Sequence, residues 1–256
     1  MPRLASRWWA LLAPSRRALK LARPAAAEFV GTALLLCAIV GSGIMAQRLF
    51  GGNVGLALLA NAIATGGALV ALLLAFGPVS GAHFNPAVTL VDAWQGGIAK
   101  AAILPYVVAQ IAGALSGTAL ANGMFGLPLF FTSSHARSGS GMLVSEFVAT
   151  FGLLAVIWGC ARARSAGTAY AVAAYIVGAY WFTPSTSFAN PAVTIARSLT
   201  GTFAGIRLQD VSAFIAVQLA GAFVATALFA WLSPIRKSIA ESVVVPHIEV
   251  AGKLAR

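Results

Sequence analysis

Charge is scarce in this chain, and negative charge most of all. Only six Asp and Glu accompany 17 Lys and Arg, and charged residues make up 9% of the 256 residues. A soluble domain carries about 25% charged residues. Hydrophobic residues make up 59% of the chain, and its mean hydropathy is +0.87. These values exclude an ordinary soluble protein and predict an integral membrane protein with a single membrane domain.

Cysteine is scarce as well, and the usual signatures of an enzyme are missing. Cys37 and Cys160 are the only cysteines, both lie in apolar stretches, and they offer neither a metal-ligand spacing nor a disulfide framework. The sequence holds no phosphate-binding loop, no nucleophile with a base and no pair of catalytic acids in a soluble cleft. We therefore expect no metal, no cofactor and no enzyme activity.

Long stretches without any charged residue cover most of the chain. A membrane-spanning helix needs about 20 residues. The stretch 49–91 is too long for one span and too short for two, so a span followed by a half-helix fits it, and the same holds for 165–196. The charge-free stretches are 29–47, 49–91, 101–136, 147–161, 165–196 and 211–235.

Two copies of one pentapeptide stand inside those two stretches, Asn85-Pro86-Ala87-Val88-Thr89 and Asn190-Pro191-Ala192-Val193-Thr194. A short apolar run follows each and ends at a glycine, Gly96 or Gly201. Asn side chains cap free backbone N–H groups at helix starts, and Pro fits the first helical position. Ten residues of helix rise about 15 Å, half of a hydrocarbon core of about 30 Å. The sequence therefore predicts two half-helices that start near the middle of the bilayer, 86–95 and 191–200.

The segment Gly81-Ala82-His83-Phe84-Asn85-Pro86-Ala87-Val88-Thr89 resembles the first signature loop of the aquaporin, or major intrinsic protein, family. The resemblance covers residues 25–235. It implies an all-α membrane protein with six transmembrane helices and two re-entrant half-helices, which together form a passive pore. It also implies that four such chains assemble as a homotetramer.

A channel domain, 25–235, is predicted between a basic N-terminal segment, 1–24, and a tail, 236–256. An amphipathic segment lying on the inner leaflet and a disordered basic tail are both compatible with the composition of 1–24. The six spans are predicted at 25–47, 55–76, 99–121, 142–161, 166–182 and 211–232, with a linking loop at 122–140.

The two halves of this domain, 25–121 and 142–232, repeat one another. Glu28-Phe29-Val30 matches Glu146-Phe147-Val148, and a Gln-x-Ala-Gly-Ala motif occurs in the third and sixth spans. Because each half contains three spans, the second half crosses the membrane in the opposite sense, and such inverted repeats place the permeation site at the midplane. Irregular backbone at that depth is buried in protein or lines a cavity, so the loops 77–85 and 183–190 are predicted to line the pore.

Positive charge is distributed unequally between the two sides that this topology defines. Thirteen of the 17 Lys and Arg lie on the side of the termini, and Arg48, Arg137, Arg197 and Arg207 lie on the other. The positive-inside rule then places both termini in the cytoplasm, and we expect the protein in the cell membrane. The net charge of +11 is therefore a topology signal, and we expect the lipid bilayer rather than nucleic acid as a partner.

Five polar residues carry the functional hypothesis: the first residue of each pentapeptide, a glutamate in the first span of each half, and a histidine just before the first pentapeptide. Asn85 and Asn190 either only cap the half-helices or also point amide donors into the pore, and the half-helix geometry makes both roles compatible. Glu28 and Glu146 either couple transport to protons or accept hydrogen bonds from the re-entrant loops, and the resemblance implies the second role. His83 is either a structural histidine or a pH gate near the cytoplasmic mouth of the pore.

The resemblance places the outer selectivity filter at Thr65, Gly178, Ser187 and Val193. Val193 stands where water-selective members of the family typically have arginine, and the other positions lack their bulky aromatic residue and histidine. A bacterial branch of the family has valine at this place. We therefore expect a wide filter without fixed positive charge, which admits small uncharged solutes: glycerol-like polyols, urea, arsenous acid and water.

Arg197 leaves a second possibility open. It lies one turn after Val193 on the same helical face, so it either restores the missing charge in the pore mouth or pairs with lipid headgroups or an extracellular loop. We favour the second. The competing functions are a water-selective aquaporin, a coupled secondary transporter and a non-conducting scaffold. Only Glu28 and Glu146 among the acids fall within the predicted spans, which disfavours the transporter.

Overall fold

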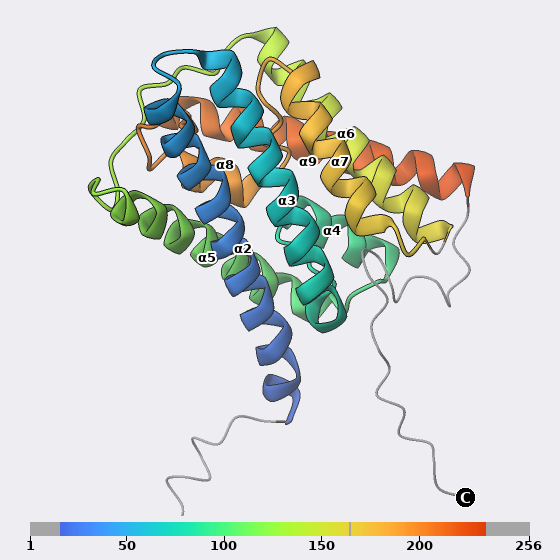
Figure 1. Cartoon of the computed structure of the whole chain (residues 1–256). Helices are drawn as coiled ribbons and strands as arrows, with labels where there is room; N and C mark the ends of the chain where they lie inside the picture. Colours follow the sequence, from blue (N-terminus) through green and yellow to red (C-terminus); the bar gives the residue numbers. More distant parts are fainter. Residues whose placement is uncertain (1–15, 164, 234–256) are drawn as a thin grey trace, which may run out of the picture.

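The computed structural model describes residues 16–163 and 165–233, and these residues form helices and loops without a strand (Figure 1). The predicted N-terminal segment lies outside the described residues up to residue 15, and α2 begins within it; the tail, 236–256, lies wholly outside them. In chain order the elements are α2 (Arg16–Leu49), α3 (Val54–Ser80), α4 (Pro86–Gln95), the 3₁₀ turn η1 (Lys100–Ala102), α5 (Ile103–Met124), α6 (Ser140–Arg162), α7 (Thr168–Phe182), α8 (Pro191–Arg197) and α9 (Leu208–Leu232).

Five of the described helices are long and apolar enough to cross a membrane: Leu21–Leu49, Val54–Ser80, Lys100–Met124, Ser140–Arg162 and Leu208–Leu232. The remaining predicted span, α7, is an apolar helix of 15 residues, or about 22 Å. It ends at Phe182 because Pro184 disfavours helical conformation in the residue before it, and Thr183 is extended at φ −118° and ψ 129°. The chain then enters the second re-entrant loop.

Helix α3 extends beyond the predicted span 55–76. It continues through Pro78 to Ser80 and stops where Gly81 adopts φ 83° and donates its N–H to the carbonyl of Gly77 at 2.8 Å. The prediction that the helix ends at residues 76–78 is therefore wrong. A proline removes one helical hydrogen bond without ending the helix here, whereas a left-handed glycine is a common helix terminator.

Matching glycines bring the helices of each half together. α2 packs along α5, and α6 packs along α9. A Cβ added to Gly113 of α5 would stand 2.3 Å from the carbonyl oxygen of Phe29, and one added to Gly221 of α9 would stand 2.5 Å from the carbonyl oxygen of Phe147. The two halves therefore use the same close approach of backbones, which any side chain at these glycines would prevent.

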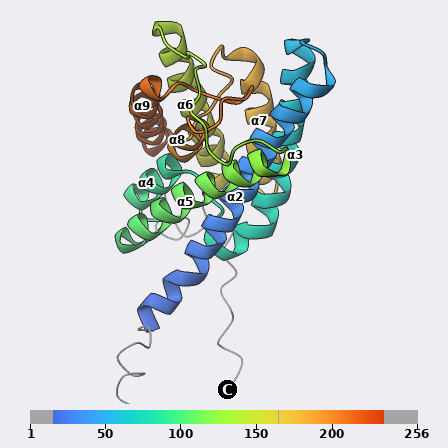
Figure 2. The same cartoon turned by 90° about the vertical axis from the view of Figure 1, so that its left-hand side faces the viewer.

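The two half-helices lie at different heights of the helical body, and Figures 1 and 2 both show α8 above α4. α4 has the predicted bounds and ends at left-handed Gly96, φ 83°. α8 ends at Arg197 rather than at residue 200. The next two carbonyls, of Ser198 and Leu199, accept hydrogen bonds from the loop that links α5 to α6 instead of continuing the helix.

Candidate pore

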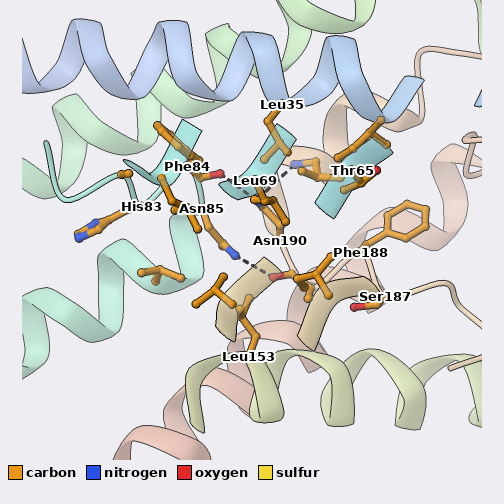
Figure 3. Close-up of a pocket in the computed structure, with 18 of the residues that line it drawn as sticks. Leu35, Thr65, Leu69, His83, Phe84, Asn85, Leu153, Ser187, Phe188 and Asn190 are labelled. Atoms are coloured by element: carbon orange, nitrogen blue, oxygen red, sulfur yellow. Dashed lines mark hydrogen bonds between the residues drawn. The ribbon is translucent and has the colours of Figure 1, made fainter. Parts of the chain in front are cut away.

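A cavity passes between the two re-entrant loops, with α2, α3, α6 and α7 around it. Figure 3 shows His83 at one end of the cavity, Asn85 and Asn190 in its middle, and Ser187 at the other end. Most of the remaining wall is aliphatic: Leu35, Ile39, Leu69, Leu73, Val88, Leu153, Ile157, Val172 and Ile176. Such a wall offers a passing molecule few polar groups, so the position of each polar group decides what the cavity accepts.

The two asparagines cap the half-helices. Oδ1 of Asn85 accepts the N–H of Ala87 at 2.9 Å, and Oδ1 of Asn190 accepts the N–H of Ala192 at 3.0 Å. A proline follows each asparagine at the first helical position, where no N–H is needed. The caps fix the N-terminal ends of α4 and α8 in the middle of the cavity, and these ends carry the positive poles of the helix dipoles.

The same asparagines tie the two loops together. Nδ2 of Asn85 donates to the carbonyl of Ala189, and Nδ2 of Asn190 donates to the carbonyl of Phe84, each at 2.8 Å. Both side chains also line the cavity. A side-chain amide carries two N–H donors, so each asparagine keeps a second donor for a molecule inside the cavity.

The residues before each asparagine have a left-handed backbone. In the first loop φ is 48° at both Ala82 and Phe84; in the second it is 64° at Thr186, 51° at Ser187 and 47° at Ala189. The residues one and three places before each asparagine therefore match. Non-glycine residues in this conformation cost about 1 kcal/mol or more each, so contacts elsewhere must hold both loops in place.

Glu28 provides such contacts for the first loop. One carboxylate oxygen accepts the hydroxyl of Ser80 at 2.6 Å and the N–H of His83 at 3.0 Å. The other accepts the N–H of Phe84 at 2.6 Å and the amide of Gln110 at 2.7 Å. The side chain is fully buried and does not line the cavity. These contacts are those of a brace, because every partner donates to the carboxylate and the carboxylate itself does not line the cavity.

Glu146 makes the equivalent contacts in the second half. Its carboxylate accepts the N–H of Phe188 at 2.8 Å, the N–H of Ala189 at 2.9 Å and the side-chain amide of Gln218 at 2.6 Å. Gln218 and its counterpart Gln110 were not predicted as parts of the site. Their signal in the sequence is the repeated Gln-x-Ala-Gly-Ala motif, in which a polar residue recurs at the same place in two apolar spans.

His83 lies in the wall at its end of the cavity and is tied to the first half-helix. Its Nδ1 is 3.1 Å from Oγ1 of Thr89, and its Nε2 is 3.5 Å from Oδ2 of Asp92. Both His83 and Asp92 are buried. Asp92 was not singled out from the sequence, although it is the one acidic residue in either half-helix. These contacts suit the structural role that was weighed for His83.

Three of the four predicted filter residues, Thr65, Ser187 and Val193, line the cavity. Gly178 does not: it is exposed on α7, and Tyr180 lines the wall instead, with its hydroxyl 3.2 Å from Oγ1 of Thr65. Two residues along a helix turn a side chain by about 200°, so a small error in an ungapped alignment reverses the face. The predictions of Gly178 in the wall and of a filter without a bulky aromatic residue are therefore wrong.

The hydroxyl of Ser187 is the unused polar group at this end of the cavity. The side chain is buried, and its Oγ has no hydrogen-bond partner among the described residues. Buried hydroxyls normally find a partner. Because Ser187 lines the cavity, this unpartnered hydroxyl lies beside the path of a molecule that passes through it, with its oxygen buried against the wall in this structure.

Arg197 also lines the cavity, one helical turn beyond Val193. Its side chain is 2% exposed, its Nε donates to the carbonyl of Ala204, and its guanidinium carbon lies 3.4 Å from the centre of the Phe188 ring. The contact with Ala204 is the expected contact with a loop, but the predicted arginine-free wall is wrong. Because the loop folds back over the end of α8, with Ile206 donating its N–H to the carbonyl of Arg197, the side chain is enclosed rather than directed to headgroups.

Comparisons with known proteins agree with this geometry. The family model described as major intrinsic protein matches residues 15–186. The aquaglyceroporin AqpS of Rhizobium meliloti (strain 1021) is 51% identical over 212 residues, which cover 83% of this chain and 91% of that relative. Aquaporin Z of Rhodopseudomonas palustris (strain ATCC BAA-98 / CGA009) is 34% identical over 152 residues, which cover 54% of this chain and 62% of that relative.

A solved structure shares the fold. The X-ray structure of the aquaglyceroporin from Plasmodium falciparum matches with a TM-score of 0.57 and covers 86% of this chain and 98% of its own, at 21% sequence identity. At that identity the likeness concerns the fold alone. The family match and the relative at 51% identity show that the chain belongs to the major intrinsic protein family.

Proposed function

We propose that this chain is a passive channel for small uncharged solutes, with glycerol-like polyols and water among them. One observation carries the proposal: Asn85 and Asn190 stand in the middle of a mostly aliphatic cavity, each with one amide N–H left over after its contact with the opposite loop. The relative at 51% identity is named an aquaglyceroporin. Glycerol-like polyols and water suit a mostly aliphatic wall that offers a few hydrogen bonds.

The middle of the cavity selects molecules that accept hydrogen bonds and carry no positive charge. A water or polyol oxygen between Asn85 and Asn190 accepts hydrogen bonds from their free N–H groups. The water molecules on either side are then oriented away from this point, which interrupts proton transfer along the chain of waters. The two half-helix N-termini add the positive poles of their dipoles at the same place, which repels cations.

The Ser187 end of the cavity suits a solute with a polar and a carbon face. The free hydroxyl of Ser187 and the Thr65–Tyr180 pair offer hydrogen bonds. Val193 makes the wall apolar at the position where water-selective relatives typically have arginine. Urea and arsenous acid are small and uncharged at neutral pH, so we include them among the proposed solutes.

A water-selective channel is the second candidate, because Arg197 adds a guanidinium to the wall next to Val193. Light scattering from proteoliposomes exposed to water, glycerol and arsenite gradients separates the two. Permeation of all three supports the broader channel, and permeation of water alone would support the second candidate. A coupled transporter has less support, since the carboxylates of Glu28 and Glu146 are engaged by the loops.

We place this channel in the cell membrane as a homotetramer, with both termini and the His83 end of the cavity in the cytoplasm. The distribution of Lys and Arg supports the orientation. Large apolar side chains exposed on the spans, such as Leu34, Leu104 and Trp231, offer surface for lipid and for neighbouring subunits. Labelling of single introduced cysteines from either side of sealed vesicles tests the orientation, and cross-linking tests the tetramer.

A further inference from the structure

Arg137, in the loop between α5 and α6, is a buried arginine that joins three segments at the Ser187 end of the cavity. Its side chain is 5% exposed. Nε donates to the carbonyl of Gly205 at 2.9 Å, and Nη1 donates to the carbonyl of Ser185 at 2.8 Å. Its backbone N–H donates to a carboxylate oxygen of Asp210 at 2.8 Å. The guanidinium therefore ties the linking loop to the second re-entrant loop and to the loop after α8.

Arg137 and Arg197 share one aromatic ring. The guanidinium carbon of Arg137 lies 4.9 Å from the centre of the Phe188 ring, and that of Arg197 lies 3.4 Å from the same centre. Phe188 itself lines the cavity, and its N–H is held by Glu146. A cation within about 6 Å of a ring centre is attracted to the ring. One ring in the pore wall therefore gathers two guanidinium groups.

Neither guanidinium forms a direct ion pair with a carboxylate of the described residues, although the charge of Glu146 acts on both from a distance. The ion pairs found among the described residues are His83–Asp92 and Arg207–Asp210. Arg137 and Arg197 donate their side-chain N–H groups to carbonyl oxygens, which satisfy hydrogen bonds without cancelling charge. Burial lowers the pKa of Arg137 to about 10, so the guanidinium remains charged at neutral pH.

We propose that Arg137 is a specificity-determining residue of the pore: with Arg197 and the shared Phe188 ring it forms a two-arginine collar that excludes small cations. The proposal rests on the proposed channel function. Arg137 does not line the cavity, so it acts through Phe188 and Arg197, by its charge and by positioning them. The collar presents no comparable electrostatic barrier to neutral solutes, because its charge acts far more strongly on ions than on uncharged molecules.

The test compares two fluxes through the same proteoliposomes: glycerol, and labelled guanidinium ion, a small cation that stays charged at neutral pH. We expect Arg137→Gln to raise the guanidinium-to-glycerol ratio about tenfold or more while glycerol flux stays within about twofold. Arg137→Lys keeps the charge and should keep the low ratio. Arg48→Gln is the matched control, because Arg48 also donates to a carbonyl, that of Phe125 at 2.7 Å, and lies over a ring, yet is exposed and away from the cavity.

An unchanged ratio in Arg137→Gln, with glycerol flux intact, would overturn the collar. If Arg137→Gln does not fold, Arg137→Lys decides: a low ratio supports the collar, and a ratio raised about tenfold overturns a role for the charge. Equal rises in Arg137→Gln and Arg48→Gln would also contradict the proposal. Failure of the proposed function itself would be visible separately, as wild-type vesicles that pass glycerol no faster than empty ones.

Discussion

Asp92 and Arg197, an acidic and a basic residue, occupy equivalent positions of the two half-helices. Asp92 follows Asn85 at the same interval at which Arg197 follows Asn190, and both are buried near the C-terminal ends of α4 and α8. A helix dipole favours a cation at that end and disfavours an anion. The two halves of the inverted repeat therefore match in backbone but differ in the side chain at this position. The acidic residue lies toward His83, and the basic residue lies toward Ser187.

Because its charge stands at the unfavourable end of α4, Asp92 should tolerate loss of that charge. Asp92→Asn keeps an oxygen for the contact with His83, and Oδ1 of Asp92 has no hydrogen-bond partner among the described residues. We expect an equal or higher melting temperature in detergent for this variant. Asp92→Ala should lower it, since the buried imidazole then loses a partner. A large loss of stability in Asp92→Asn would show that the fold needs the charge.

The two glutamate braces should be equivalent in mutagenesis. In Glu28→Gln or Glu146→Gln an NH₂ group replaces one acceptor oxygen and meets backbone N–H groups that need an acceptor. We expect each change to lower the free energy of unfolding by about 2 kcal/mol or more, measured by thermal melting of the solubilised protein. An unchanged melting temperature with loss of proton-dependent transport would instead point to a coupled transporter.

The glycine contacts between helices can be tested against a matched position. Gly113→Ala and Gly221→Ala place a methyl group against a carbonyl oxygen of the partner helix, whereas a Cβ at Gly67 meets nothing within 4 Å. We expect the first two to lose about 1–3 kcal/mol of stability and Gly67→Ala to be neutral or stabilising by up to about 1 kcal/mol. Similar melting temperatures for all three would contradict close packing at the two contacts.

His135 gives a pH dependence of defined sign. Although the side chain is exposed, partial loss of hydration, followed by the charges of Arg137 and Arg197, lowers its pKa from the ordinary value of 6.5. As the pH falls below that value, the unfolded chain binds the proton before the folded chain does, so stability falls until the folded-state pKa is passed. We expect a small decrease in melting temperature on acidification below pH 6.5, reduced in His135→Gln. Identical pH profiles for the two proteins would contradict this.

Val193 lines the cavity, and we expect it to control the width of the outer constriction in the proposed channel. Val193→Arg adds a second guanidinium beside Arg197 in the cavity wall. We expect glycerol and arsenite fluxes to fall first and water flux to persist, measured by light scattering on the same vesicles. Equal loss of all three fluxes would point to misfolding rather than to a narrower filter.

Features that depend on local chemistry were predictable from the sequence. The caps of α4 and α8 follow from Asn-Pro, and the bracing glutamates follow from their matching places in a repeat. The helical architecture follows from the length of the charge-free apolar stretches. Two of them are too long for one membrane span and too short for two, which indicates a span followed by a half-helix. The caps need only neighbouring residues and the architecture needs the thickness of the bilayer, whereas the glutamates are identified by the repeat and by the family resemblance.

Features that depend on long-range chain paths were not predictable. Whether Gly178 or Tyr180 faces the cavity depends on how many residues the turn after α7 consumes. Arg197 is enclosed because the loop after α8 folds back to bring the carbonyl of Ala204 to it. Arg137 belongs to a loop without periodic pattern, so its position over Phe188 is visible only in the folded chain.

We propose that neutral solutes cross this protein passively. The most direct test is the glycerol flux into proteoliposomes as a function of external glycerol concentration, measured with and without a proton gradient. We predict that the flux exceeds that of empty vesicles, rises linearly with concentration and is unaffected by the gradient. A flux that saturates and follows the proton gradient, or vesicles that admit water but no glycerol, would contradict the claim.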